Sequence, residues 1–306
     1  MIESLREHSD YFHIYVFTFD DLSCNILRDM NLEKVTVISL NEFETPDLLA
    51  VKETRTMAEY CWTCTPWTIK HVFEKYKVQE CTYIDADLEF YDNPEILLNE
   101  MKSDSSTLIT EHRYSKLEKI YEEKRAGKFC VQFIAFNTSS ESKKILNNWA
   151  NQCIDWCYNR YEDGKFGDQK YLDEWPEKYN NVHILENEGG GVAPWNIKKY
   201  HFEGESDGIL LTNRRTRKKT RLVFYHFHSF KLLNYHEVDL GWHSINKQLV
   251  SLIYKSYTKQ LLEIENALSK KYPEYNTVFH KPESKNIKDF IKNNIKRLFR
   301  YNYYQI

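Results

Sequence analysis

The stretch that decides the fold is Cys81–Leu88, with the sequence CTYIDADL. Its apolar half, Cys81–Ile84, is typical of a short buried strand, and the strand ends directly in Asp85 and Asp87. Apolar runs of this kind that alternate with helical stretches predict a mostly parallel sheet with helices on both faces. Ligands of such sheets bind beyond the carboxyl ends of the strands, so both carboxylates lie where a ligand is expected.

Strands and helices alternate on both sides of this stretch. From residue 244 onward the pattern is helical. The chain is therefore expected to form an α/β domain over residues 1–240, followed by a C-terminal helical extension over residues 241–306. The expected strands lie at 13–19, 34–39, 107–110, 131–137 and 182–185, and the expected helices at 54–76 and 139–158.

Composition narrows the class of protein. Of the 306 residues, 42% are hydrophobic, which is enough for a sizeable core, and the net charge of -3 predicts no nucleic-acid partner. Seven cysteines are an odd number for a disulfide framework. The sequence shows neither a secretory signal pattern nor an apolar run of about 18 residues, so a cytoplasmic location is expected.

The acidic pair suggests a metal site. Two carboxylates spaced by one residue at the end of a strand can both approach a divalent cation. Hard oxygen ligands suit Mg²⁺ or Mn²⁺, ions that also bridge phosphate oxygens. Because Asp-x-Asp also arises by chance, a turn with two solvated acids is the alternative interpretation.

A second candidate lies at Phe224–Lys231, with the sequence FYHFHSFK. On a strand, His226 and His228 point to the same face, so that one of them could complete the metal shell. Lys231 could then neutralise a diphosphate. The alternative is an ordinary pair of histidines on a half-buried strand.

Two loops add further candidates. In Asp163–Leu172 the side chain of Asp168 either caps the next helix or faces a ligand together with Gln169. In Glu188–Asn196 three consecutive glycines, including Gly190 and Gly191, let the backbone approach a ligand closely. Trp195 and Asn196 could then offer a stacking face and an amide, whereas a purely structural loop is the alternative.

These motifs resemble those of bacterial glycosyltransferases of the GT-A fold, close to family 8, the glycogenin and lipopolysaccharide galactosyltransferase type. The resemblance covers roughly residues 1 to 240. It is carried by Glu59–Thr63, Tyr83–Asp87, Glu162–Leu172, Gly191–Asn196 and Phe224–His228. It implies a GT-A fold, a nucleoside-diphosphate sugar donor, above all a UDP-sugar, and Mn²⁺ or Mg²⁺. The implied acceptor is a glycan or a lipid-linked molecule of bacterial surface polysaccharide synthesis.

The resemblance also implies a role for each matched residue. Asp85 and Asp87 would hold the metal and the ribose-phosphate, with His226 or His228 as the third protein ligand. Asp168 and Gln169 would be catalytic residues beside the donor sugar, in a reaction that retains the anomeric configuration. The other donor-binding candidates are Arg55, Gly190, Gly191, Trp195, Asn196 and Lys231.

One feature departs from that family. Related chains have a strand for the nucleotide base before the helix that contains Glu3–Leu5, whereas this sequence starts at the helix, so the first strand is expected to be missing. A catalytically impaired sugar-nucleotide-binding or scaffold protein is therefore an alternative. A sugar nucleotidyltransferase is another, although its usual N-terminal Gly-rich basic loop is absent.

The C-terminal segment 285–300 is expected to form a basic amphipathic helix. One face would carry apolar side chains and the other mostly lysine and arginine. Such a helix can lie on an anionic membrane surface, which would make the protein peripheral to the inner face of the membrane. The alternative is packing against the catalytic domain or a partner subunit.

Overall fold

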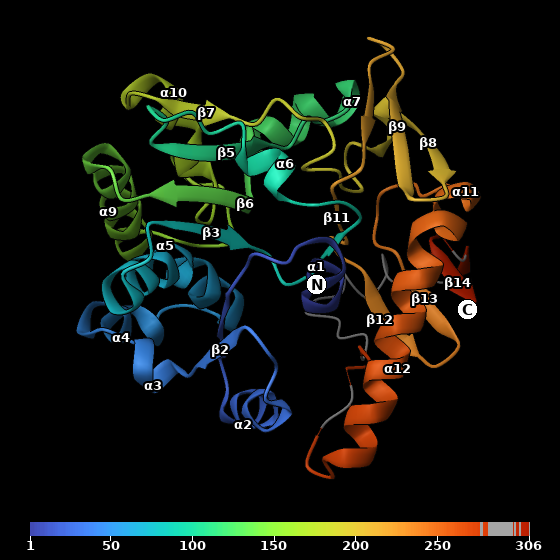
Figure 1. Cartoon of the computed structure of the whole chain (residues 1–306), viewed down its shortest axis with the longest axis horizontal. Coiled ribbons are helices and arrows are strands. Elements are labelled where there is room, and N and C mark those ends of the chain that lie inside the picture. Colours follow the sequence, from blue (N-terminus) through green and yellow to red (C-terminus); the bar gives the residue numbers. More distant parts are fainter. Residues whose placement is uncertain (276–277, 281–295, 297, 300, 306) are drawn as a thin grey trace.

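The computed structural model describes residues 1–275, 278–280, 296, 298–299 and 301–305. At its centre lies a four-stranded sheet with the strand order β3–β6–β5–β7 (Figure 1). These strands are β3 (Glu80–Ile84), β6 (Phe129–Asn137), β5 (Thr107–Glu111) and β7 (Val182–Ile184). Helices α5 (Met57–Tyr76) and α9 (Ser140–Asp155) pack on one face of this sheet and against each other.

The sheet is mixed, which corrects the expectation of a mostly parallel GT-A sheet. Strand β6 runs antiparallel to both of its neighbours, β3 and β5, and only β5 and β7 are parallel within this sheet. The reason is the arm 112–128, which turns back after β5 and returns the chain into β6 without a crossover helix. The sequence does not reveal this, because β6 is buried on both faces and therefore has the continuous apolar run of a parallel strand.

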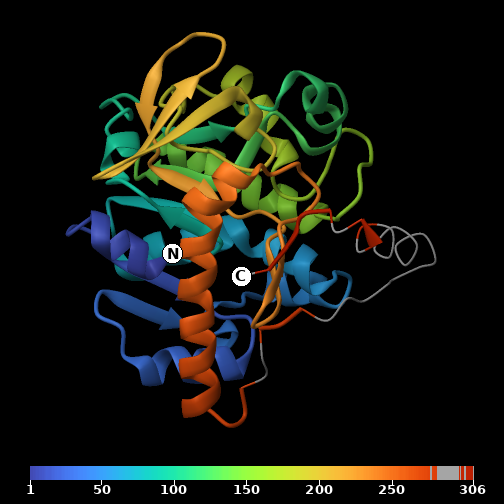
Figure 2. The same ribbon diagram turned by 90° about the vertical axis from the view of Figure 1, so that its right-hand side faces the viewer.

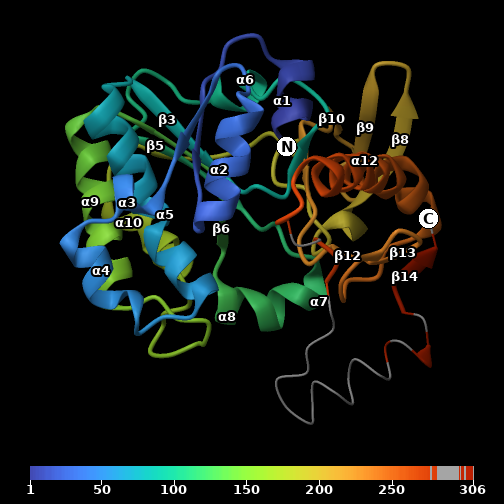
Figure 3. The same cartoon turned by 90° about the horizontal axis from the view of Figure 1, so that it is seen from below.

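The N-terminal part forms a separate parallel pair, β1 (Ile14–Phe17) with β2 (Val35–Ile38). Helix α2 (Asp21–Met30) connects the two strands, and its N-terminus is capped by Asp20, whose carboxylate accepts a hydrogen bond from the Ser23 amide. Figure 3 shows this pair and its helices beside the central sheet. The other helices of this half are α1 (Ile2–His8), α3 (Leu40–Phe43) and α4 (Pro46–Lys52).

A second group of strands lies to one side of the central sheet, on the side that faces the viewer in Figure 2. Strand β4 (Leu88–Phe90) follows the acidic pair directly and pairs antiparallel with β11 (Phe224–His226). The other two small sheets are β8 (Tyr200–Glu205) with β9 (Gly208–Asn213) and β10 (Lys219–Arg221), and β12 (Lys231–Asn234) with β13 (Glu237–Asp239) and β14 (Tyr303–Gln305).

The C-terminal part is built around α12 (Lys255–Lys271), the long helix at the right of Figure 1. Tyr254 and Tyr257 share one hydrophobic cluster with Tyr225 and Phe227, so this part packs on the strand that carries the histidines. Strand β14 pairs with β13, which precedes residue 240. Most of the expected amphipathic helix at 285–300 lies outside the described residues. Among those described, no helix is both long and apolar enough to span a membrane.

Short helical turns fill the connections. They are α6 (Glu95–Leu98), α7 (Lys116–Glu118), η1 (Lys119–Glu123), α8 (Lys124–Ala126), η2 (Lys170–Glu174), α10 (Trp175–Lys178), η3 (Ile197–Lys199), α11 (Lys247–Leu249) and η4 (Val250–Tyr254).

The glycine loop shows why the chain needs glycine at residue 191. Gly191 has a φ of +76°, and a Cβ placed there would lie 2.6 Å from Cγ2 of Thr110. Gly164 has nearly the same φ, +78°, but no atom lies within 4 Å of its hypothetical Cβ. Alanine substitutions at the two glycines therefore share the cost of backbone strain, but only the one at Gly191 adds a steric clash.

Gly191→Ala is expected to cost about 1–3 kcal/mol more free energy of unfolding than Gly164→Ala, because only the first overpacks the sheet. Urea unfolding of both variants measures this difference. Equal destabilisation would contradict the packing described for this loop.

Candidate metal centre

Asp85 and Asp87 lie on a short link whose two ends are hydrogen-bonded to different sheets. The backbone N–H of Asp85 donates to the carbonyl oxygen of Gln132 on β6 at 3.1 Å, so the ladder continues one residue past β3. The backbone carbonyl of Asp87 accepts from the N–H of Phe227 at 2.9 Å, just beyond β11. Asp85 is thus held by the central sheet and Asp87 by the β4–β11 pair, which fixes the separation of their carboxylates.

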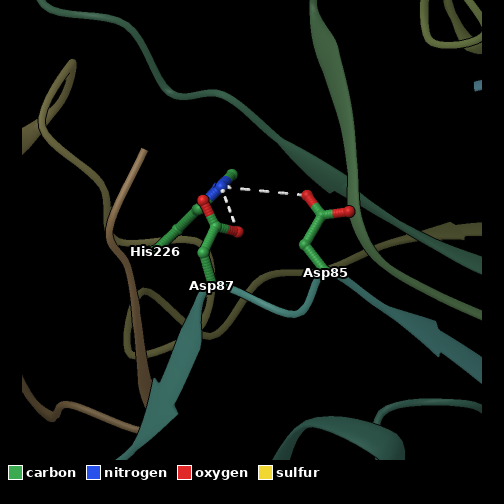
Figure 4. Close-up of side chains that lie close together, drawn as sticks. All are labelled: Asp85, Asp87 and His226. Carbon is green, nitrogen blue, oxygen red and sulfur yellow. Dashed lines mark ion pairs between the residues drawn. The ribbon is translucent and has the colours of Figure 1, made fainter. Parts of the chain in front are cut away.

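His226 faces this pair from the neighbouring strand. Its Cα partner on β4 is Leu88, the residue after Asp87. Nε2 of His226 lies 3.0 Å from Oδ1 of Asp87 and 3.8 Å from Oδ2 of Asp85 (Figure 4). One ligand atom from each residue lies within 4.8 Å of the other two. Of the two predicted histidines, His226 is the one that joins the acidic pair.

A buried glutamine orients the imidazole. The ring Nδ1 of His226 lies 2.7 Å from Oε1 of Gln132, whose side chain is fully buried. With its proton on Nδ1, the ring turns Nε2 toward the carboxylates. Hydrogen bonds of this kind fix the tautomer of metal-binding histidines in proteins. Two carboxylate oxygens and one oriented imidazole nitrogen are a donor set that fits Mn²⁺ or Mg²⁺.

The electrostatics of the three groups are strongly linked. Burial opposes the charged form of His226, but the charge and hydrogen bond of Asp87 outweigh it and raise the pKa of His226 well above its ordinary value. Burial likewise opposes ionisation of Asp87, whereas the His226 charge outweighs it and lowers the pKa of Asp87. Burial raises the pKa of Asp85 despite the nearby imidazolium. The Asp87 carboxylate and the His226 imidazolium thus stabilise each other's charged forms.

The three residues line a cavity of about 640 Å³. Aromatic rings form much of its wall: Trp195 meets His226 edge to face, with ring centroids 5.4 Å apart. His112 stacks on Tyr114 with centroids 4.6 Å apart. Flat aromatic faces beside polar and charged groups are typical of small-molecule sites. The remaining lining residues are Trp62, Tyr83, Ala86, Glu122, Arg125, Ala126, Cys130, Val131, Asn159, Phe166, Gly167, Asp168, Gln169, His228 and His243.

Asp168 and Gln169 both line this cavity. The backbone carbonyl of Asp168 accepts from the Trp149 indole at 2.8 Å, which anchors the turn to α9. Burial raises the pKa of the Asp168 carboxyl to about 7, with a smaller upward contribution from Asp85. Nε2 of Gln169 donates to the Ala126 carbonyl at 2.7 Å.

The glycine loop contributes one side chain to the cavity. Trp195 lines it, with its indole N–H bonded to the His112 carbonyl at 2.8 Å. Asn196 is fully buried behind it and bonds to backbone atoms of His112, Gly191 and Ala193. Gly190 and Gly191 pack against the sheet. Together with Asn196 they support the cavity wall without lining the cavity.

Three other predicted residues lie outside the metal group. His228 lines the cavity, but its ring packs edge to face on Trp195 with centroids 5.4 Å apart. Arg55 donates to the Ile154 carbonyl at 3.1 Å and stacks on Tyr158, away from the cavity. Lys231 begins β12, with its Nζ 3.1 Å from a ring nitrogen of His280. Neither Arg55 nor Lys231 lines the cavity.

Several site residues were missed by the sequence analysis. Gln132 is the clearest, and its signal was a lone polar residue inside the apolar run of β6. The hydroxyl of Tyr83 donates to Oδ1 of Asp85 at 3.0 Å. His243 enters from beyond residue 240, with its Nδ1 3.2 Å from Oε1 of Glu118, and no local pattern connects these two distant positions.

Comparison with known proteins gives close relatives of unknown activity. No protein-family model matches the chain. The chain is 32% identical over 280 residues to the uncharacterized protein YfnD of Bacillus subtilis (strain 168), covering 90% of this chain and 88% of YfnD. It is 26% identical over 291 residues to the uncharacterized protein YfnF of the same organism, covering 93% and 94% of the two chains.

A solved structure is similar at a coarser level. The crystal structure of mouse xyloside xylosyltransferase 1, apo form, superposes with a TM-score of 0.40 and 15% sequence identity, covering 74% of this chain and 90% of that one.

The histidine of the metal centre can be identified by titration. His226→Ala is expected to lower the affinity for Mn²⁺ by more than about 100-fold, whereas His228→Ala changes it only a few-fold, because only Nε2 of His226 faces the carboxylates. Isothermal titration calorimetry of both variants measures this. A larger loss in His228→Ala would contradict the assignment.

Gln132→Leu tests the orienting hydrogen bond. Removal of the Oε1 acceptor frees the ring of His226 and is expected to weaken Mn²⁺ binding by roughly 10- to 100-fold. The same calorimetry measures it, with His201→Ala, at an exposed position of strand β8, as the control. Wild-type affinity in Gln132→Leu would show that the glutamine does not orient the ligand.

Proposed function

The chain belongs to the family of the Bacillus subtilis protein YfnD, and we propose that it is a metal-dependent glycosyltransferase. In this proposal the protein moves a sugar from a nucleoside-diphosphate sugar to a hydroxyl of a glycan or lipid-linked acceptor in bacterial surface polysaccharide synthesis. The observation that carries it is the Asp85–Asp87–His226 group on the wall of a cavity that Asp168 and Gln169 also line.

The donor set supports a phosphate-bearing substrate. Asp85, Asp87 and His226 would hold a divalent cation, and such a cation would also bind oxygens of a diphosphate. A cation held there supplies charge neutralisation for the departing diphosphate. Without a cation the carboxylates of Asp85 and Asp87 would face the negatively charged diphosphate directly, so metal and donor are expected to bind together.

The rest of the cavity suits a sugar. In the reaction, the bond from the anomeric carbon to the diphosphate oxygen breaks, and its electron pair leaves with the diphosphate. The acceptor hydroxyl oxygen forms the new bond to that carbon, and its proton passes to the departing diphosphate. In this proposal Asp168 and Gln169 hydrogen-bond the donor sugar, and Trp195 and Tyr114, which line the same cavity, offer flat faces for sugar rings.

Finer features of the proposal follow the family resemblance. They are a UDP-sugar as donor, Mn²⁺ or Mg²⁺ as the metal, retention of the anomeric configuration and action at the inner face of the membrane. Retention requires that the acceptor attack the face from which the diphosphate departs, so the products' anomeric configuration tests it directly by NMR.

Asp87→Ala is expected to lower metal-dependent turnover of the preferred nucleotide sugar by at least about 100-fold, because charge on the departing diphosphate loses its counter-ion. A screen of nucleotide sugars with and without Mn²⁺ identifies that donor, and His201→Ala serves as the control. Unchanged turnover in Asp87→Ala would contradict the proposal, and tight UDP binding with no turnover of any donor would indicate a sugar-nucleotide-binding protein.

Asp168 is expected to set the pH profile. Because its pKa is raised to about 7, the carboxylate form that accepts hydrogen bonds from sugar hydroxyls increases as the pH rises through that value. The rate should therefore rise with pH between about 6 and 8, and Asp168→Asn should flatten this limb. A limb that persists in Asp168→Asn would exclude Asp168 as its source.

A further inference from the structure

A second cavity, of about 520 Å³, lies between β1 and β3. Residues of both strands line it, and we call it the interstrand slot. In Figure 1 strand β2 of the β1–β2 pair lies below β3 and the central sheet. Tyr83 and Ala86 line both the slot and the metal cavity, so the two cavities meet at the acidic link.

The β1 edge of the slot has unpaired backbone groups. The amides of Ile14 and Thr18 donate to Lys34 and Ile38, on the side of β2. In a parallel ladder alternate residues point to opposite edges, so Tyr15 and Phe17 turn their N–H and C=O groups toward the slot. Within the described part of the chain these groups have no hydrogen-bond partner.

The edge of β3 that faces the slot likewise has backbone groups that point into the slot. The bond from Asp85 to Gln132 sets the phase of the antiparallel ladder with β6. Tyr83 and Cys81 therefore bond to β6, whereas Thr82 and Ile84 turn their backbone groups toward the slot. These groups too lack a partner among the described residues. Two strand edges thus face each other across one cavity.

The two faces of the slot are largely apolar. One is formed by α5, through Ile69 and Val72, and the other by Phe90, Leu98 and Phe133. A strand with both faces buried consists of an almost continuous apolar run.

The combination of apolar faces and polar edges selects the occupant. An alkyl chain would fill the apolar volume but leave the N–H and C=O groups of both edges unpaired, which is unfavourable. A polypeptide strand satisfies both edges at once, because neighbouring strands lie about 4.8 Å apart and exchange such bonds.

We propose that the interstrand slot binds an extended polypeptide strand of about five residues, apolar on both faces, that pairs with β1 and β3 and joins the two sheets. Its length matches the five residues of β3. One end of the bound strand lies against Ala86, between the two metal-binding aspartates. The strand would therefore brace the link that carries Asp85 and Asp87.

The test is amide hydrogen exchange of the full chain with a synthetic peptide, five Val and Ile residues flanked by lysines. Saturable binding is expected to slow exchange at Tyr15, Phe17, Thr82 and Ile84 by at least about ten-fold, because new hydrogen bonds form there. The amides of Val35–Ile38 on β2 serve as an internal control.

Three comparisons decide between occupants. The same peptide with N-methylated amides keeps its side chains but cannot donate, so it should not bind. A linear twelve-carbon alcohol should not protect the four amides. Thr68→Trp, in the slot wall, should abolish peptide binding, whereas Lys70→Trp on the same helix should not.

Protection at both strands that is lost on N-methylation supports the proposal. Unchanged exchange with the peptide, protection of the four amides before any peptide is added, or equal binding of the N-methylated peptide would overturn it. If Thr68→Trp fails to fold, the N-methylated peptide still decides the outcome.

Discussion

The site depends on one constraint, the double anchoring of the short link Asp85–Asp87. The Asp85 amide is bonded to β6 and the Asp87 carbonyl to the chain just after β11. The same two strands supply Gln132 and His226, which are bonded to each other. Two sheets that are far apart in sequence are thus connected through a few hydrogen bonds, and the three metal-ligand candidates converge there as a result.

Much of this could be predicted from local patterns. The apolar run before Asp85 predicts the strand. The carboxylate and imidazole side chains predict metal ligands, because these groups bind divalent cations. The glycine turn before Asp168 and Gln169 singled them out as ligand-facing candidates, with helix capping as the alternative, and both line the cavity. Each of these inferences depends on residues that are close in sequence, so local physics decides them.

The features that sequence reasoning missed are long-range. Strand direction in the central sheet depends on how the arm 112–128 returns, and an apolar run has no direction. Gln132 acquires its role only because β11 lies against the Asp85–Asp87 link. The choice between His226 and His228 depends on where β11 ends, since His228 lies past the strand and turns to Trp195. Arg55 and Lys231 had suitable charge but are held elsewhere by packing.

The most direct test of the metal centre is anomalous diffraction at the manganese edge, from crystals soaked with Mn²⁺ and UDP. The account predicts one peak at about 2.0–2.3 Å from a carboxylate oxygen of Asp85, a carboxylate oxygen of Asp87 and Nε2 of His226, with diphosphate oxygens at the open positions. A peak elsewhere, or density for UDP without a metal between it and these three residues, would contradict it.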